Sequence, residues 1–116
     1  MVTEGGARSV SQAGNHDNRN YEDDWGERFQ GLLRRTNGGD NYESQANQLV
    51  AENLRGKLLL AHGAMDSNVP PYNTYLVVDA LVKANKDFDL ILFPHRLGAV
   101  AGRCRRGEPE SPIRWP

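Results

Sequence analysis

Four polar residues have the types and the spacing that acid–base chemistry requires. His62, Asp66 and Asn68 lie in one short segment directly after an apolar run of the 116-residue sequence, and His95 follows a second apolar run. A carboxylate that accepts a hydrogen bond from an imidazole is the orienting half of a Ser-His-Asp relay. Spacing alone, however, favours a simpler interpretation, in which Asp66 forms a turn and His95 is a solvated loop residue.

Two predicted strands place these residues at one edge of a sheet. Residues 57–61 form a continuous apolar run, which is typical of a strand buried on both faces, and residues 88–93 form a second apolar segment. Between them, residues 72–84 have apolar side chains at helical spacing. This order predicts an α/β fold with one βαβ unit, parallel strands and a right-handed crossover. Since parallel strands end at the same edge, the loops carrying Asp66 and His95 are expected together at the usual ligand edge.

The segments around this unit carry weaker patterns. Gly, Ser and other polar residues without periodicity predict a loop or disorder over residues 1–13. Residues 21–33 and 41–53 have apolar side chains at helical spacing, which predicts two helices. Residues 95–116 are rich in Arg, Gly and Pro and have no hydrophobic period, so we expect disorder there too. The folded part is therefore expected to span residues 14–94. The side chains expected to point inward from the second helix are Tyr42, Ala46, Leu49 and Val50.

Composition excludes several classes of function. Fourteen basic and fifteen acidic residues give a formal net charge of -1, which is too weak a field to hold nucleic acid or an anionic membrane. The chain is long enough for one small domain. Its apolar runs fall far short of the roughly 20 residues that a membrane-spanning helix needs. We therefore expect no nucleic-acid partner and no membrane span.

A complete catalytic centre is not apparent from these residues. The G-x-S-x-G elbow that presents a nucleophilic serine does not occur in the sequence. Cys104, the single cysteine, lies in the segment without predicted structure, where no neighbour is fixed to activate its thiol. A metal site would need ligands at an established spacing, and we expect no metal or cofactor. The spacing of the candidate ligands matches no established motif; they are His16, Asp17, His62 and Asp66.

Three stretches of the sequence are recognisable when taken together. They are G-N-H-D-N-R-N-Y-E-D-D-W-G-E-R over residues 14–28, the stretch 41–54, and L-L-L-A-H-G-A-M-D-S-N-V-P-P over residues 58–71. Together they resemble the C-terminal catalytic domain of the prolyl oligopeptidase (S9) serine peptidases, in particular the dipeptidyl peptidase IV-like branch. The similarity runs from about residue 10 to residue 94, and the H-G-x-x-D-x-N-V loop is its most specific part. The resemblance implies a partial α/β-hydrolase fold and hydrolysis of peptide substrates through a serine ester.

The resemblance also implies roles for individual residues. Asp66 resembles the triad aspartate that orients the catalytic histidine. Asn68 and Val69 resemble residues of the substrate pocket, where Asn68 would donate a hydrogen bond to the substrate backbone. Tyr21 and Trp25 correspond to aromatic residues that line the pocket for the side chain before the scissile bond.

Two features depart from the family pattern. The family's nucleophile elbow lies upstream of the G-N-H-D stretch, and this chain begins too late to contain it. The family's base histidine, in a P-x-x-x-H-G pattern, is expected near position 98, where this chain has Gly98, and His95 is the nearest candidate base. The tail that follows has the composition expected of a shifted reading frame or of a divergent sequence.

We therefore predict a catalytic-domain fragment of a serine peptidase. It carries the triad aspartate and is expected to be inactive on its own. The alternative prediction is a non-catalytic α/β module that binds another chain through a retained pocket or an exposed sheet face.

Overall fold

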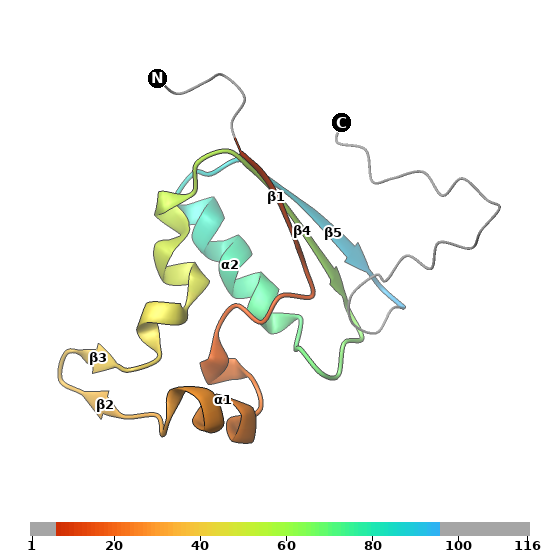
Figure 1. Ribbon diagram of the computed structural model, residues 1–116. Helices are drawn as coiled ribbons and strands as arrows, with labels where there is room; N and C mark the ends of the chain where they lie inside the picture. The colour runs from red at the N-terminus through yellow and green to blue at the C-terminus, as the bar shows by residue number, and fades with distance from the viewer. Residues whose placement is uncertain (1–6, 96–116) are drawn as a thin grey trace.

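A parallel three-stranded sheet forms the centre of the structure, a computed structural model that describes residues 7–95 (Figure 1). The strand order is β1-β4-β5, with β1 at Arg8–Gln12, β4 at Lys57–Gly63 and β5 at Phe88–Phe93. Helix α2, Tyr72–Lys83, connects β4 to β5. The predicted βαβ unit is therefore confirmed, including the parallel pairing of its two strands.

Strand β1 corrects the expectation of a loop or disorder over residues 1–13 within the described part of that range, and residues 1–6 lie outside it. Arg8–Gln12 pairs in parallel with β4, from Arg8 opposite Lys57 to Gln12 opposite Ala61. The sequence of this strand, RSVSQ, is mostly polar, and its residues are exposed or half-buried. The strand therefore has no hydrophobic pattern from which it could be predicted. Pairing with a neighbour, not its own hydrophobicity, makes this segment a strand. Among the described residues, no strand pairs with the other edge of β1.

Short elements connect β1 to β4. They are the 3₁₀ helix η1 (Asn18–Asn20), helix α1 (Asp23–Gln30), the antiparallel strands β2 (Arg35–Thr36) and β3 (Gly39–Asp40), and the 3₁₀ helices η2 (Glu43–Gln45) and η3 (Asn47–Asn53). The first predicted helix is confirmed in a shorter form as α1. The second prediction, one helix over residues 41–53, is wrong in type because two 3₁₀ helices occupy this range.

The 3₁₀ geometry changes which side chains point inward. Tyr42 and Ala46 are buried as expected, but Leu49 and Val50 are 53% and 49% exposed. A 3₁₀ helix has three residues per turn, so residues three apart share a face. Ala51 and Gln48 are three residues apart and therefore lie on one face of η3. Ala51 is buried, and the side-chain amide of Gln48 donates to Asp17.

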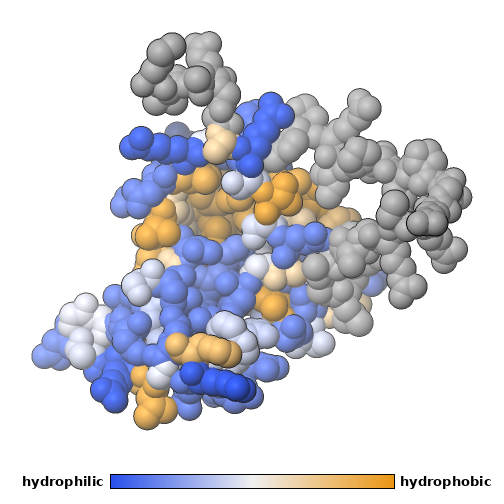
Figure 2. Space-filling view, in the orientation of Figure 1, coloured by the Kyte–Doolittle hydropathy of each residue, from blue (hydrophilic) through white to orange (hydrophobic). Residues whose placement is uncertain are grey.

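The apolar core lies between the sheet and the two helical elements η3 and α2, which cover the same face (Figure 1). Its buried centre consists of Ala51, Leu60, Val77 and Leu81. Strand β4 is buried on both faces as predicted, because Leu59 and Ala61, which alternate with Leu60, are also buried. In Figure 2, hydrophobic residues gather over this part of the molecule, whereas the part with α1 and the β2–β3 hairpin is mostly hydrophilic.

Leu60→Ala is expected to destabilise the chain much more than Leu49→Ala. Leu60 is 1% exposed, and truncating such a leucine costs about 2–5 kcal/mol through lost burial and the cavity left behind. Leu49 is 53% exposed, so its truncation is expected to cost less than about 0.5 kcal/mol. Urea unfolding followed by circular dichroism measures both. Equal losses of stability would contradict the placement of the core.

Candidate functional site

The loops after β4 and β5 meet at the carboxyl edge of the sheet. The backbone N–H of Ala64 donates to the carbonyl of Phe93 at 3.0 Å, which extends the β4–β5 pairing beyond the last strand residues. Asp66 lies in the first loop and His95 in the turn after β5. The two loops are therefore neighbours, as the parallel topology predicts. His95 is exposed, and within residues 7–95 no hydrogen bond or ion pair joins it to Asp66.

The carboxylate of Asp66 is buried and organises its own loop. Its Oδ1 accepts backbone N–H bonds from Asn68 at 2.9 Å and Val69 at 3.0 Å. The backbone N–H of Asp66 in turn donates to the carbonyl of Gly63. The simpler interpretation of Asp66 as a turn residue is thus correct for Oδ1. Oδ2 accepts neither of these bonds and lies 3.5 Å from Nε2 of His62.

His62 is fully buried beneath this loop, and both of its ring nitrogens bond to neighbouring parts of the fold. Its Nε2 lies 3.0 Å from the carbonyl oxygen of Val69, and its Nδ1 lies 2.6 Å from Oγ1 of Thr74. A carbonyl only accepts, so Nε2 carries a proton, and in the neutral ring the Thr74 hydroxyl donates to Nδ1. Both nitrogens of the ring are therefore occupied in holding the loop against α2.

Three of the residues assigned to a substrate pocket come together. The hydroxyl of Tyr21 donates to Oδ1 of Asn68 at 3.0 Å, across 47 positions of sequence. The rings of Tyr21 and Trp25 pack edge to face, with centroids 5.8 Å apart and planes at 77°. Trp25 is 44% exposed and also contacts Phe29. Val69 is half-buried and follows Asn68 in the sequence, and its backbone N–H donates to Oδ1 of Asp66.

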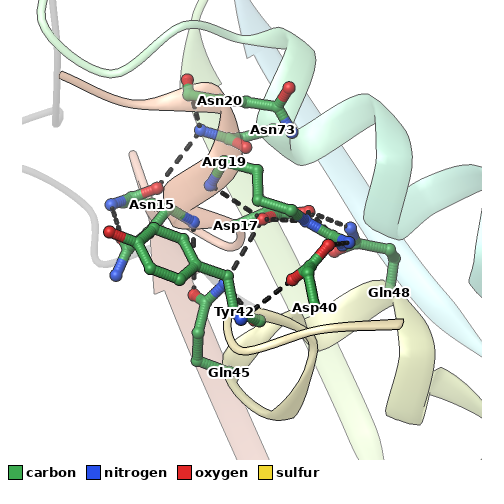
Figure 3. Close-up of polar contacts among 10 residues, drawn as sticks. Asn15, Asp17, Arg19, Asn20, Asp40, Tyr42, Gln45, Gln48 and Asn73 are labelled. Atoms are coloured by element: carbon green, nitrogen blue, oxygen red, sulfur yellow. Dashed lines mark hydrogen bonds and ion pairs between the residues drawn. The ribbon is translucent and has the colours of Figure 1, made fainter. Parts of the chain in front are cut away.

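A buried charge cluster holds the segment that leads to Tyr21 (Figure 3). Asp17 is 1% exposed, and both of its oxygens accept bonds from the guanidinium of Arg19 at 2.8 to 3.1 Å. Arg19 also donates to Asp40 at 3.1 Å. The side-chain amides of Gln45 and Gln48 donate to the two oxygens of Asp17. The cluster therefore joins η1 to β3, η2 and η3.

The bonding partners of Asp17 decide its ionisation. Burial on its own raises the pKa of Asp17, but the hydrogen bonds from Arg19 and Gln48 outweigh burial and hold the pKa below its ordinary value. The hydrogen bond to Asp17 in turn raises the pKa of Arg19. Both groups are thus charged at neutral pH, and the buried carboxylate is compensated by a close cation.

His16 is the second buried histidine, and its ring contacts two polar side chains. Nδ1 lies 2.9 Å from Nδ2 of Asn47 and Nε2 lies 3.5 Å from Oγ of Ser11. Burial, together with repulsion from nearby His62, lowers the pKa of His16. The amide of Asn47 donates, so Nδ1 accepts and Nε2 carries the proton that points to Ser11.

Asn73 and Thr74 are buried polar residues of α2 that the helical pattern did not identify. Asn73 is 0% exposed, and its Nδ2 donates to Oδ1 of Asn15 at 3.3 Å and to the carbonyl of Asn20 at 3.5 Å. Asn20 directly precedes Tyr21. Two polar residues on the buried face of a predicted amphipathic helix are the sequence signal that points to such contacts.

An apolar cavity of about 380 Å³ opens between β1, β4, η3 and α2. Its walls include Leu58, Leu60, Val77 and Leu81, and Ser11 and His16 form part of its polar end. This cavity is separate from the surface formed by Tyr21 and Asn68, which are not among its walls.

The described part of the chain contains neither a cluster of metal ligands nor a membrane-spanning helix. In residues 7–95, no three His, Cys, Asp or Glu side chains gather closely enough to hold a metal ion. His16 and Asp17, considered as metal ligands, instead bond to Asn47 and Arg19. None of the helices over the same residues has the length and apolar character needed to cross a membrane.

Comparison with known proteins agrees with this arrangement. The sequence model described as "Prolyl oligopeptidase family" matches residues 7–101. The chain belongs to the prolyl oligopeptidase family. Dipeptidyl peptidase family member 1 of Caenorhabditis elegans is 36% identical over 47 residues, which are 40% of this chain and 6% of that protein.

Solved structures place this prolyl oligopeptidase family chain in the dipeptidyl peptidase IV-like branch. Dipeptidyl peptidase 4 of Porphyromonas gingivalis is 32% identical with a TM-score of 0.70, and the match covers 78% of this chain and 12% of that one. A putative dipeptidyl aminopeptidase IV of Bacteroides ovatus is 28% identical with a TM-score of 0.72, covering 83% and 13%. The predicted partial α/β-hydrolase fold is therefore confirmed, and the chain spans only about an eighth of these relatives.

The stability of the chain is expected to fall as the pH drops through about 6.5, the ordinary pKa of histidine. Since the folded state lowers the pKa of His16, the unfolded state binds more protons in this range, and stability rises with pH. Asp17 acts only in a lower window, because its pKa lies below the ordinary carboxyl value.

His16→Gln is expected to reduce the slope of stability against pH between pH 5 and 7, by at most about 1.4 kcal/mol per pH unit. Urea unfolding at several pH values measures the slope. His95→Gln is the matched control, because it makes the same substitution at an exposed histidine. An identical slope in the wild type and His16→Gln would show that His16 titrates normally.

Proposed function

We propose that this chain is the part of a serine peptidase catalytic domain that supplies the triad acid and one wall of the substrate pocket. The observation that carries the proposal is the hydrogen bond from Tyr21 to Asn68. It joins the two sequence motifs that resemble the pocket of the family, and it does so two residues from Asp66. The family and the solved relatives support the same assignment.

Each proposed role is the one that the family resemblance implies, and acyl-transfer chemistry explains the part of Asp66. Asp66, through Oδ2, would orient the imidazole that takes the proton of the nucleophilic serine. Nδ2 of Asn68 would donate to a carbonyl of the peptide backbone, and Val69 would contact the substrate next to it. The rings of Tyr21 and Trp25 would form an apolar wall for the side chain before the scissile bond. Similarity to dipeptidyl peptidases suggests peptides as the substrate class.

The isolated chain lacks an activated nucleophile in this proposal. A serine hydroxyl attacks only when a neighbouring base removes its proton. Ser11 is 3.5 Å from Nε2 of His16, but that nitrogen already carries a proton and does not act as a base. His95, the candidate base, is exposed at the end of the described residues. The serines of the sequence, none in a G-x-S-x-G elbow, are Ser9, Ser11, Ser44, Ser67 and Ser111.

The purified chain is expected neither to cleave a chromogenic dipeptide substrate nor to react with a serine-directed fluorophosphonate. Mass spectrometry of the treated protein measures the labelling, with an active serine peptidase as the positive control. Stoichiometric labelling of one serine that is lost in Asp66→Asn would contradict inactivity and reveal a rearranged triad.

A non-catalytic binding module is the second candidate function. The edge of β1 that no strand of residues 7–95 pairs with, and the apolar cavity beside it, favour this alternative, since exposed edges and apolar surfaces recur at sites where proteins associate. Genomic DNA around the coding region distinguishes the two candidates. Codons for a serine elbow upstream, with a His-Gly pair in another frame downstream, would support the peptidase. Their absence would support the binding module.

A further inference from the structure

Asn73 links the two segments that carry the proposed pocket residues, the segment leading to Tyr21 and the loop of Asn68. It lies in the first turn of α2, directly after the loop of Asp66 and Asn68, and is completely buried. Its Nδ2 bonds to the carbonyl of Asn20, the residue before Tyr21. One side chain thus links the backbone that carries Tyr21 to the helix that follows the Asn68 loop.

The amide of Asn73 is poorly explained by stability alone. Its Oδ1 is buried and has no hydrogen-bond partner among the described residues. An unsatisfied buried acceptor costs stability, whereas an apolar side chain of similar volume carries no such penalty. The donor end of the amide, which reaches the segment before Tyr21, is therefore the useful part of this side chain.

The position of Tyr21 matters for the orientation of Asn68. A side-chain amide has an accepting end and a donating end, and an exposed asparagine is otherwise free to turn. The hydroxyl of Tyr21 occupies Oδ1 of Asn68. With Oδ1 occupied, Nδ2 is left to donate to an acceptor outside the chain, such as a peptide carbonyl.

The geometry points to Asn73 as a positioning residue that holds Tyr21 on Asn68, so that Asn68 presents its Nδ2 to a backbone carbonyl of a peptide. The inference rests on the proposed function, because it gives the pocket residues a role in binding peptide. The inference adds one point to the proposed function. The buried amide of Asn73, which does not touch the substrate, determines that Asn68 recognises a hydrogen-bond acceptor such as a peptide carbonyl.

Asn73→Leu separates positioning from stability in the full 116-residue chain. We expect only a small change in the urea midpoint, because removal of the orphaned oxygen offsets the loss of the two hydrogen bonds from Nδ2. The side-chain ¹H–¹⁵N signals of Asn68, assigned with Asn68→Asp, are expected to shift toward free-asparagine values. Tyr21→Phe, which removes only the hydroxyl, is expected to shift them in the same way. Asn53→Leu, at an exposed asparagine, is the matched control and is expected to leave these signals unchanged.

Titration with the peptide Ala-Pro-Ala tests the consequence for binding. The Kd is expected to rise about tenfold in Asn73→Leu and in Tyr21→Phe, a change of about 1.4 kcal/mol in binding free energy. The double variant is expected to lose no more than either single variant, because both act on one contact.

The outcomes separate the inference from the proposed function. A lower urea midpoint with unchanged Asn68 signals in Asn73→Leu would overturn the inference, because Asn73 would then be only structural. Loss of peptide affinity that adds fully in the double variant would also overturn it. Wild-type chain that does not bind the peptide, while the Asn68 signals shift as expected, would refute the proposed function and leave the positioning role supported.

Discussion

Parallel pairing of β4 with a strand on each side is the constraint on which the rest of the structure depends. Its side chains are buried on both faces, and both neighbours run in its direction. The carboxyl ends of three strands therefore meet at one edge. Two bonds beyond the strands extend this pairing, from Ala13 to the carbonyl of Ala61 and from Ala64 to the carbonyl of Phe93. The segment leading to Tyr21 and the loop of Asp66 consequently begin side by side.

Buried polar groups then fix the loops that leave this edge. Asp17 is compensated by Arg19, and breaking such a buried pair costs about 3–5 kcal/mol because a charge is left without a partner. His62 holds the other loop through Val69 and Thr74. These networks fix the positions of the two loops more than they stabilise the fold. The free energy lost by removing charged groups from water offsets much of the free energy gained from their attraction. The Asp17 cluster therefore positions Tyr21, and the contacts of His62 position the loop that carries Asn68.

The elements with strong hydrophobic patterns could be predicted from the sequence. Strands β4 and β5 and helix α2 have apolar residues at the period of their element type, so their type could be predicted. The strand-helix-strand order then predicted that the two strands pair in parallel. Strand β1 could not be predicted this way, because RSVSQ is polar and becomes a strand only through its partner. The 3₁₀ helices over residues 43–53 also escaped prediction, since Leu49 and Val50 fit an α-helical face that the structure does not form.

The candidate site was predictable in part. Topology placed Asp66 at the sheet edge. Family resemblance assigned Tyr21 and Asn68 to a substrate pocket, but their hydrogen bond was not predicted, because spacing carries no information on contacts 47 positions apart. Asp17 was weighed only as a metal ligand, although Arg19 two residues later is its partner. The disordered tail expected over residues 95–116 lies outside the described residues except at His95.

A chimera tests most directly whether this chain carries a functional acid and pocket. Residues 8–93 would replace the matching segment of Porphyromonas gingivalis dipeptidyl peptidase 4, with which the chain shares a TM-score of 0.70. The account predicts a folded protein that cleaves a chromogenic dipeptide substrate and loses activity by roughly 10⁴-fold in Asp66→Asn. A folded chimera without activity, or one whose activity survives Asp66→Asn, would contradict it.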